Sequence, residues 1–235
     1  MTTIRIPGLP LVRTIFITIL VFFLGSIIAA CQKLDQDQPQ ELLSAVNVVN
    51  ASIGMNPVGF FIGGSKVQGA PLHYTGESGY FITFPGEKTF DAIEDTAPDY
   101  FLKTSVTFKQ NTYHTIFIAG EPGSITTLFT EDDLTAPPAG KAKIRFVQLS
   151  PDGGSLILSL KNGTVLFPEQ GYKTASAFKT LDPGVYDLQL KTATGELLAE
   201  QNVTINAGIM YTAWVKGLRS NVSNSPIGLQ LRSIN

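Results

Sequence analysis

The sequence has few of the residues that build metal centres or disulfides. It contains one cysteine and two histidines among 235 residues. A single cysteine excludes an intramolecular disulfide and a site built on several thiolates. His73 and His114 have no carboxylate or cysteine neighbour at ligand spacing, so we predict no metal site and no cofactor. His114 lies in a strand-like run and is expected to be a half-exposed strand residue.

Charge is also scarce, because only 15% of the residues are charged. The only charges in residues 1–30 are Arg5 and Arg13, which leaves residues 31–235 with a formal net charge of −4. Binding of nucleic acid requires a basic surface that replaces phosphate counterions. The composition therefore argues against a nucleic-acid partner.

Catalytic motifs are missing as well. The sequence has no G-x-S-x-G nucleophile elbow, and catalysis by a Ser-His-Asp triad would require His73 or His114 to lie next to a serine. The acidic run 131–133 could contribute to a calcium loop, but a solvated turn between repeats is the favoured alternative. We predict that the protein is not an enzyme.

The N-terminus has the three parts of an export signal. Two arginines precede an apolar run of ten residues, 15–24, which is shorter than the ~20 residues of a membrane-spanning helix. Small residues follow, and residues 28–31 resemble the bacterial lipobox. That resemblance implies cleavage before Cys31 and lipid on its thiol. We predict that residues 1–30 are a lipoprotein signal peptide; the alternative is an uncleaved N-terminal anchor.

Residues 31–43 are the predicted lipidated cysteine and flexible tether. The segment is polar and has no hydrophobic period, which is typical of a linker. Aspartate does not directly follow Cys31, and by resemblance to the proteobacterial sorting rule this favours the outer membrane. Asp35 and Asp37 resemble the surface-export signals of Bacteroidota lipoproteins, with an ordinary solvated linker as the alternative. We predict an outer-membrane lipoprotein of the cell envelope and leave open whether it faces the periplasm or the outside.

From Ser44 onward the apolar residues recur with period two between frequent turn signals. No long segment after residue 40 has a helical period. Many short strands at roughly 8–12-residue spacing indicate a sandwich or a barrel. The pattern predicts an all-β fold.

The β region also resembles itself, which is typical of a repeat. Residues 46–52 align with residues 144–150 at an offset of 98. Gly120 aligns with Gly217 at an offset of 97, a drift that one short loop deletion would produce. We predict two copies of one unit of about 95 residues, the size of a small sandwich. The predicted bounds are 44–134 for a degenerate first repeat, 135–141 for a short semi-rigid linker and 142–235 for the second repeat.

The second copy contains three strings that together resemble a known family. They are residues 146–152, 182–186 and 207–212. They are similar to F-V-H-L-S-P-D, P-A-G-x-Y and A-G-x-x-Y-T, the signatures of an uncharacterised family of bacterial secreted β-sandwich repeats, a domain of unknown function. Gln148 stands where the family has histidine. The resemblance covers residues 141–220 well and 44–130 weakly. It implies two tandem Ig-like antiparallel β-sandwiches and an envelope location, and it supplies no catalytic residue.

Two residues are candidates for ligand contact or modification. Trp214 is the only tryptophan. Period-two alternation puts Trp214 on one strand face with Thr212 and Lys216, which leaves room for an exposed ring that stacks on a sugar. A buried ring that packs the sandwich is the favoured alternative. Residues 95–97 resemble the O-glycosylation acceptor of Bacteroidota, which implies a glycan on Thr96.

These observations predict a non-catalytic, membrane-anchored lipoprotein that acts as a binding, adhesion or structural presentation module. The alternative is a glycan-binding accessory lipoprotein of a nutrient-uptake system. The expected partners are the membrane, through lipid on Cys31, and an envelope protein or a glycan. The sequence leaves the ligand and the oligomeric state open.

Overall fold

The strands of the protein fall into two sets that have the same pairing order. The computed structural model describes residues 43–67, 69–95, 99–220 and 225–234. The predictions for the signal peptide, for most of the tether, for Cys31 and for Thr96 lie outside these residues. The first set contains β1 (Ser44–Ser52), β2 (Val58–Ile62), β3 (Ser65–Lys66), β4 (Phe81–Thr83), β5 (Gly86–Glu94), β6 (Tyr100–Phe108), β7 (Tyr113–Gly120) and β8 (Thr126–Asp132).

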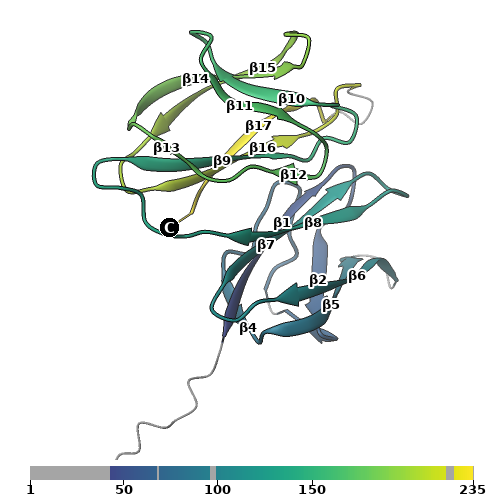
Figure 1. Ribbon diagram of the computed structural model, residues 1–235. Coiled ribbons are helices and arrows are strands. Elements are labelled where there is room, and N and C mark those ends of the chain that lie inside the picture. The colour runs from purple at the N-terminus through teal and green to yellow at the C-terminus, as the bar shows by residue number, and fades with distance from the viewer. Residues whose placement is uncertain (1–42, 68, 96–98, 221–224, 235) are drawn as a thin grey trace, which may run out of the picture. The chain divides into compact units, whose positions relative to one another are not determined.

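The second set follows in the green-to-yellow part of the chain in Figure 1. It contains β9 (Ala142–Gln148), β10 (Leu156–Leu160), β11 (Val165–Gln170), β12 (Thr174–Ala175), β13 (Lys179–Leu181), β14 (Gly184–Thr192), β15 (Leu197–Ile205), β16 (Met210–Lys216) and β17 (Gly228–Ile234). Within the described residues no helix is long and apolar enough to cross a membrane.

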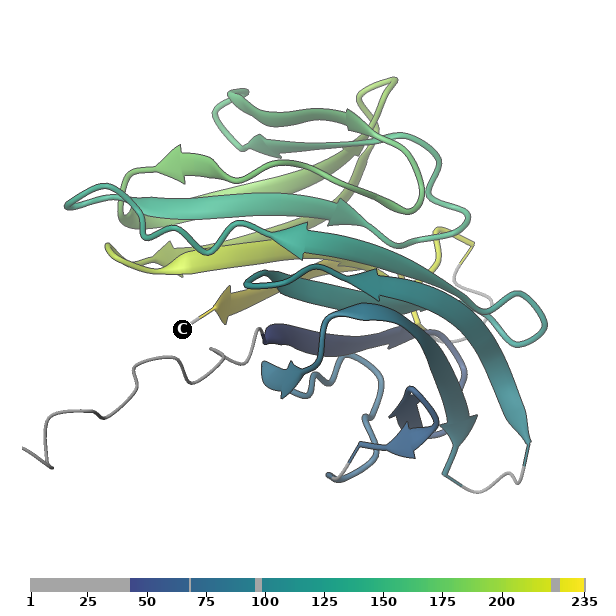
Figure 2. The ribbon, with the colours of Figure 1, turned by 60° about the horizontal axis from the view of Figure 1, so that its bottom comes forward.

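Each set forms two sheets. The first set has the strand orders β4-β1-β7-β8 and β3-β2-β5-β6. The second set has the orders β12-β9-β16-β17, with β13 also beside β9, and β11-β10-β14-β15. Figure 2 shows the purple-to-teal strands of the first set and the green-to-yellow strands of the second in two separate groups. The predicted all-β sandwich class is confirmed, while the predicted domain bounds stay predictions. We call the two sets the first and the second sandwich.

The register of equivalent strands agrees with the offset of the sequence repeat. Val46 of β1 pairs with Phe81 of β4, and Ile144 of β9 pairs with Lys179 of β13, so both members of the pair are shifted by 98 residues. Position-by-position comparison of the two sandwiches therefore has a structural basis.

The resemblance implied antiparallel sandwiches, but the sheets of the protein also contain parallel pairs. β1 pairs in parallel with β7, and β9 pairs in parallel with β16. A parallel neighbour requires a long connection. Here the chain builds all of the opposite sheet between the two parallel strands.

Three apolar clusters hold these sheets together. The core of the first sandwich includes Val46, Val48, Phe60, Phe90 and Ile116. The core of the second sandwich includes Phe146, Leu156, Phe167, Leu190 and Val215. The third cluster joins the outer faces of β1 and β7 to those of β9 and β16 and consists of Val49, Ala51, Phe117, Ala119, Val147, Leu149 and Trp214. These four strands are therefore buried on both faces.

A buried ion pair crosses the contact between the two sandwiches. The Arg145 guanidinium of β9 contacts the Asp132 carboxylate of β8, and both side chains are buried. Arg145 Nε also donates to Thr212 Oγ1 at 2.9 Å. Asp132 accepts a second hydrogen bond from the Tyr80 hydroxyl at 2.6 Å and a third from the Thr115 hydroxyl. The prediction that Asp132 lies in a solvated turn is wrong, because its side chain is buried and accepts hydrogen bonds from Arg145, Tyr80 and Thr115.

Candidate binding groove

Trp214, the predicted sugar platform, lies inside the contact between the sandwiches. Its side chain is 1% exposed and packs in the third cluster, with Phe117 and Val147. Alternation along β16 does place Trp214 away from the core of its own sandwich, but β1 and β7 cover that face. Its ring therefore offers no stacking surface to a sugar. The side chain is packed and buried, which was the favoured alternative.

His114 is buried, so the prediction of a half-exposed strand residue is wrong. Its ring stacks on Phe129 with centroids 4.9 Å apart, and burial lowers its pKa below the ordinary value. Ser44 Oγ lies 3.1 Å from His114 Nδ1, but the serine hydroxyl donates to the Thr112 carbonyl. The backbone N–H of Lys109 lies 3.4 Å from His114 Nε2, and Thr112 Oγ1 lies 3.1 Å from the same nitrogen. A serine held this way keeps its proton, and the pair is structural.

The described residues contain no group of three or more His, Cys, Asp or Glu side chains that could hold a metal ion. In the acidic run, Glu131 pairs with Lys109 and Asp133 lies 3.7 Å from Lys143. Each of these carboxylates therefore faces a cation of the protein. The calcium-loop interpretation of residues 131–133 gains no support from this geometry.

The motif residues of the repeat have structural roles. The Gln148 side chain accepts a hydrogen bond from the Ser150 backbone N–H at 2.7 Å and donates to the Gly154 carbonyl at 2.9 Å. Gly120 and Gly217 both have positive φ, and a Cβ on either would lie 2.5 Å or less from a backbone oxygen. The strings that identify the repeat thus stabilise turns, and a ligand site must be sought elsewhere.

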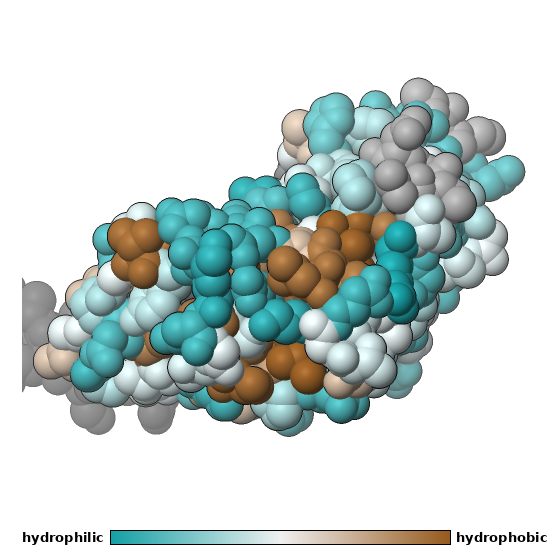
Figure 3. Space-filling model, turned by 90° about the horizontal axis from the view of Figure 1, so that it is seen from above, coloured by the Kyte–Doolittle hydropathy of each residue, from teal (hydrophilic) through white to brown (hydrophobic). Residues whose placement is uncertain are grey.

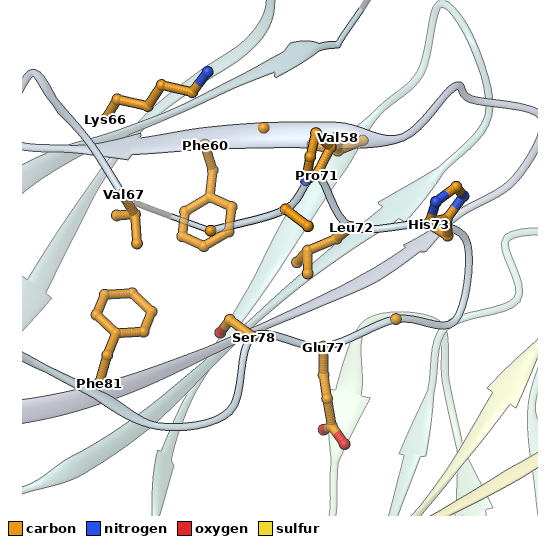
Figure 4. A pocket seen from close by; sticks show the side chains of 14 residues that line it. Val58, Phe60, Lys66, Val67, Pro71, Leu72, His73, Glu77, Ser78 and Phe81 are labelled. Carbon is orange, nitrogen blue, oxygen red and sulfur yellow. The ribbon is translucent and has the colours of Figure 1, made fainter.

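An apolar groove opens on the first sandwich between the edge of β2 and the loop that leads from β3 to β4. It has a volume of about 500 Å³ and lies within the range of ligand pockets. Figure 4 shows Phe60, Val67 and Phe81 pointing toward one another along it. The apolar lining is Val58, Phe60, Val67, Ala70, Pro71, Leu72 and Phe81. The polar side chains of the lining are His73, Glu77, Ser78 and Lys66. Lys66 lies next to Val67, and His73 lies beyond Leu72 (Figure 4).

The groove forms where strand pairing at the edge of the sheet is interrupted. Val67 still donates to the Phe60 carbonyl at 3.1 Å, and Leu72 exchanges two backbone hydrogen bonds with Val58 at 2.9 and 2.8 Å. Phe60 and Val58 lie two positions apart on β2, whereas their partners Val67 and Leu72 lie five positions apart in the sequence. Residues 69–71 lie between these partners outside any strand, and they line the groove.

β1 holds the far wall of the groove in place. Asn50 Nδ2 donates to the Leu72 carbonyl at 2.8 Å, and the Val48 N–H donates to Ser78 Oγ at 2.9 Å. The second sandwich contributes as well, because Arg232 of β17 donates to the Thr75 carbonyl at 2.5 Å and lies 3.8 Å from Glu77. The wall is therefore fixed in place before any ligand binds, which reduces the entropy cost of binding.

The equivalent position in the second sandwich is filled. Leu158, the counterpart of Phe60, pairs with Phe167, whose ring is buried in the core. Only two residues separate Phe167 from Gln170, the partner of Leu156, so β11 stays paired with β10 across a single register shift. Lys179 occupies the place of Phe81, donates to the Leu166 carbonyl at 2.7 Å and lies 5.1 Å from the Phe167 ring centroid. The same fold thus closes this edge in one sandwich and leaves it open in the other.

A second hollow, more polar and more open, lies at the junction of β7, β8 and the residues after β8. It has a volume of about 830 Å³ and is lined by Tyr80, Asn111, Thr112, Tyr113, Glu131, Asp132, Asp133, Leu134 and Thr135. Tyr113 is 44% exposed, and its ring meets that of Tyr80 edge to face at 5.5 Å. Burial, together with the neighbouring Asp132 carboxylate, raises the pKa of Tyr80.

Sequence reasoning missed the groove. The signal was present in the internal alignment, where equivalent strand partners are separated by four residues in one copy and by two in the other. Without the strand partners, that difference cannot be distinguished from an ordinary loop insertion.

The comparison with protein families gives a match that begins at the first strand. Residues 44–159 match the model of a family described as a domain of unknown function, DUF4397. The motifs predict the stronger resemblance over residues 141–220, whereas this match covers the first copy, β9 and most of β10. No curated protein matches the sequence.

Solved structures show only distant likeness. The Bacillus anthracis TIE protein is 10% identical, with a TM-score of 0.27, over 74% of this chain and 34% of that one. This chain therefore spans about a third of that protein's length. The family CBM26 module CBMbc of Eubacterium rectale Amy13K, solved with maltoheptaose, is 10% identical with a TM-score of 0.24, over 81% and 95% of the two chains. A DUF3823 family protein from Bacteroides ovatus is 9% identical with a TM-score of 0.21, over 70% and 98%.

TM-scores this low carry no argument about function. The likeness to a family therefore depends on the sequence match, which agrees with the motif resemblance to an uncharacterised family of β-sandwich repeats. Residues 44–159 are similar to the DUF4397 family, a domain of unknown function.

Proposed function

We propose that this protein is a non-catalytic binding module, held at the cell envelope by lipid on Cys31, whose first sandwich takes a ligand in the apolar groove. The observation that carries the ligand site is the open groove itself. The same edge of the second sandwich is closed by Phe167 and Lys179, so the fold does not require a hollow there. The apolar side chains that line the groove gain free energy when a ligand removes them from water.

The composition of the groove defines the class of ligand. Its walls are aliphatic and aromatic, and its polar side chains are Lys66, His73, Glu77 and Ser78. Such a site suits an apolar group, with polar contacts that set its orientation. No charged side chain lies at the centre of the groove in Figure 4, where Glu77 points away from Phe60 and Phe81.

Filling the groove is expected to weaken binding of an apolar probe. The variant Val67→Phe introduces the type of residue that closes the second sandwich, and we expect at least about tenfold weaker binding of N-phenyl-1-naphthylamine, measured by its fluorescence. All proteins carry Cys31→Ala, so that lipid does not compete for the probe. The control is Val165→Phe, since Val165 is 54% exposed on β11 and lies outside the groove. Equal probe affinity in the two variants would disprove the groove as a ligand site.

Glycan capture is the second candidate, and the polar hollow at Tyr113 favours it. A tyrosine ring presents an apolar face and a hydroxyl, which suits the mixed surface of a sugar. Asn111, Thr112 and Thr135 place amide and hydroxyl groups around the same hollow. This location differs from Trp214, where the sequence pattern suggested a sugar platform.

Removing the exposed ring tests this candidate. We expect Tyr113→Ala to eliminate any retardation of the protein in native gels that contain soluble polysaccharide, because the stacking surface is lost. Tyr172→Ala is the matched control, a tyrosine outside the hollow. If neither variant changes the migration, or the parent protein is not retarded, glycan capture at this hollow is rejected.

A further inference from the structure

We propose that the occupant of the groove is an extended peptide strand of a partner protein, with apolar side chains at alternate positions and an acidic residue near one end. The inference depends on the proposed function, because it names the ligand of the same groove. It is carried by the strand edges, the exposed apolar side chains and the charges that surround the groove.

The groove runs between two free sheet edges. β3 and β4 are each the terminal strand of their sheet. An edge strand presents unpaired backbone N–H and C=O groups, which another extended chain can pair with. Another hollow, of about 410 Å³ and distinct from the polar hollow at Tyr113, continues the groove along both strands. It shares Lys66, Val67 and Phe81 with the groove. The combined surface is a trough along the strand edges, which suits an extended chain better than a compact ligand.

Two large apolar side chains stand exposed beside this trough. Ile82 is 68% exposed and Phe84 is 62% exposed. They alternate along the chain with Thr83, as the side chains of a strand face do. In the second sandwich the same register positions are Thr180 and Asp182, which are polar. Polar and charged residues on an edge strand discourage pairing with another chain. The second sandwich has such residues at these positions, and the first does not.

Exposed apolar residues elsewhere do not adjoin such a trough. Val165, Val185 and Leu197 are exposed on β11, β14 and β15 of the second sandwich. In the view of Figure 3 the apolar side chains form separate areas among hydrophilic ones. Scattered apolar residues are normal on a protein surface and need no partner. Ile82 and Phe84 differ from them because the hollow they line continues the groove.

The charges at the Phe84 end of the trough define the partner further. Lys66 and Lys88 both line that end. Among the described residues neither lysine has an ion-pair partner. Complementary charge fixes the register of an incoming chain and speeds its association. A strand with an aspartate or glutamate at this end therefore fits the trough best.

A labelled nine-residue peptide of alternating valine and threonine, followed by two aspartates, tests the inference. Binding to the full chain carrying Cys31→Ala is measured by fluorescence anisotropy. We expect the double variant Ile82→Thr with Phe84→Asp, which copies the second sandwich, to bind at least about tenfold more weakly. Both residues are exposed, so the variant should fold. The control is Val165→Thr with Val185→Asp.

A second peptide, N-methylated at alternate residues on its pairing edge, keeps the side chains but loses backbone donors. We expect at least about tenfold weaker binding than that of the unmodified peptide. Equal binding of both peptides, or no peptide binding while the naphthylamine probe still binds, would overturn the strand inference and leave the groove as a ligand site. Failure of both probe and peptide would reject the proposed function as well. Self-association that disappears in the double variant would identify a second copy of this chain as the occupant, against the inference.

Discussion

Replacing Arg145 with methionine is expected to lower the free energy of unfolding by about 3–5 kcal/mol, because it leaves the buried Asp132 carboxylate without its cation. The Arg145 guanidinium contacts Asp132 and Thr212, and it lies 5.0 Å from the Phe178 ring centroid. Asp132 is the acceptor of several buried donors and cannot reach water. The measurement is urea unfolding followed by the fluorescence of Trp214, the only tryptophan, which is buried close to this network.

The matched control is Arg219→Met. Arg219 pairs with Glu196 at 2.5 Å, but both side chains are about half exposed, so the pair contributes at most about 1 kcal/mol. The double variant Arg145→Met with Asp132→Leu should recover most of the loss, since apolar residues of similar size often replace a buried pair without cost. If Arg145→Met were no more destabilising than Arg219→Met, the ion pair would not join the sandwiches in solution.

Replacing Cys31 with alanine is expected to move the protein from the membrane fraction to the soluble fraction of the cell. The thiol is the predicted site of the lipid, and each buried methylene of an acyl chain contributes about 0.8 kcal/mol of membrane affinity. The measurement is fractionation of cells followed by immunoblotting, with labelled palmitate to detect the lipid.

The control for this experiment is Ser44→Ala, which leaves the predicted lipobox unchanged. If Cys31→Ala stayed in the membrane and the parent protein took up no labelled palmitate, the N-terminal segment would be an uncleaved anchor and lipidation would be refuted. Protease treatment of intact cells then addresses the face of the membrane. Cleavage on intact cells would favour adhesion or capture of an external ligand, whereas protection would direct the search toward periplasmic partners.

Some features of the fold follow from local patterns in the sequence. Period-two alternation and turn residues predicted strands, because the geometry of a strand sends successive side chains to opposite faces. The internal offset of 98 predicted equivalent positions, and the pairing of Val46 with Phe81 and of Ile144 with Lys179 has that offset. These signals are read within a few residues, so they need no knowledge of the partner strand.

Burial of single residues did not follow from local patterns. His114 and Asp132 look like ordinary strand-face and turn residues in the sequence. Both are buried, because neighbouring side chains cover them. Ser44, Phe108 and Phe129 pack around His114. Tyr80 and Arg145 of β9 cover Asp132. Trp214 is hidden for the same reason, since β1 and β7 cover the outer face of β16. A period of two tells which residues share a face and does not tell what covers that face.

The sequence by itself determined the strand content, the internal repeat, the family resemblance and the expectation of an export signal ending at Cys31. Only the tertiary structure decided where a ligand could bind. The groove exists because Val67 and Leu72 find partners on β2 with a longer segment between them than Phe167 and Gln170 have on β10. Two copies of one strand pattern thus differ in one hollow, since a cavity depends on which side chains meet across the sheets and not on the pattern of either strand alone.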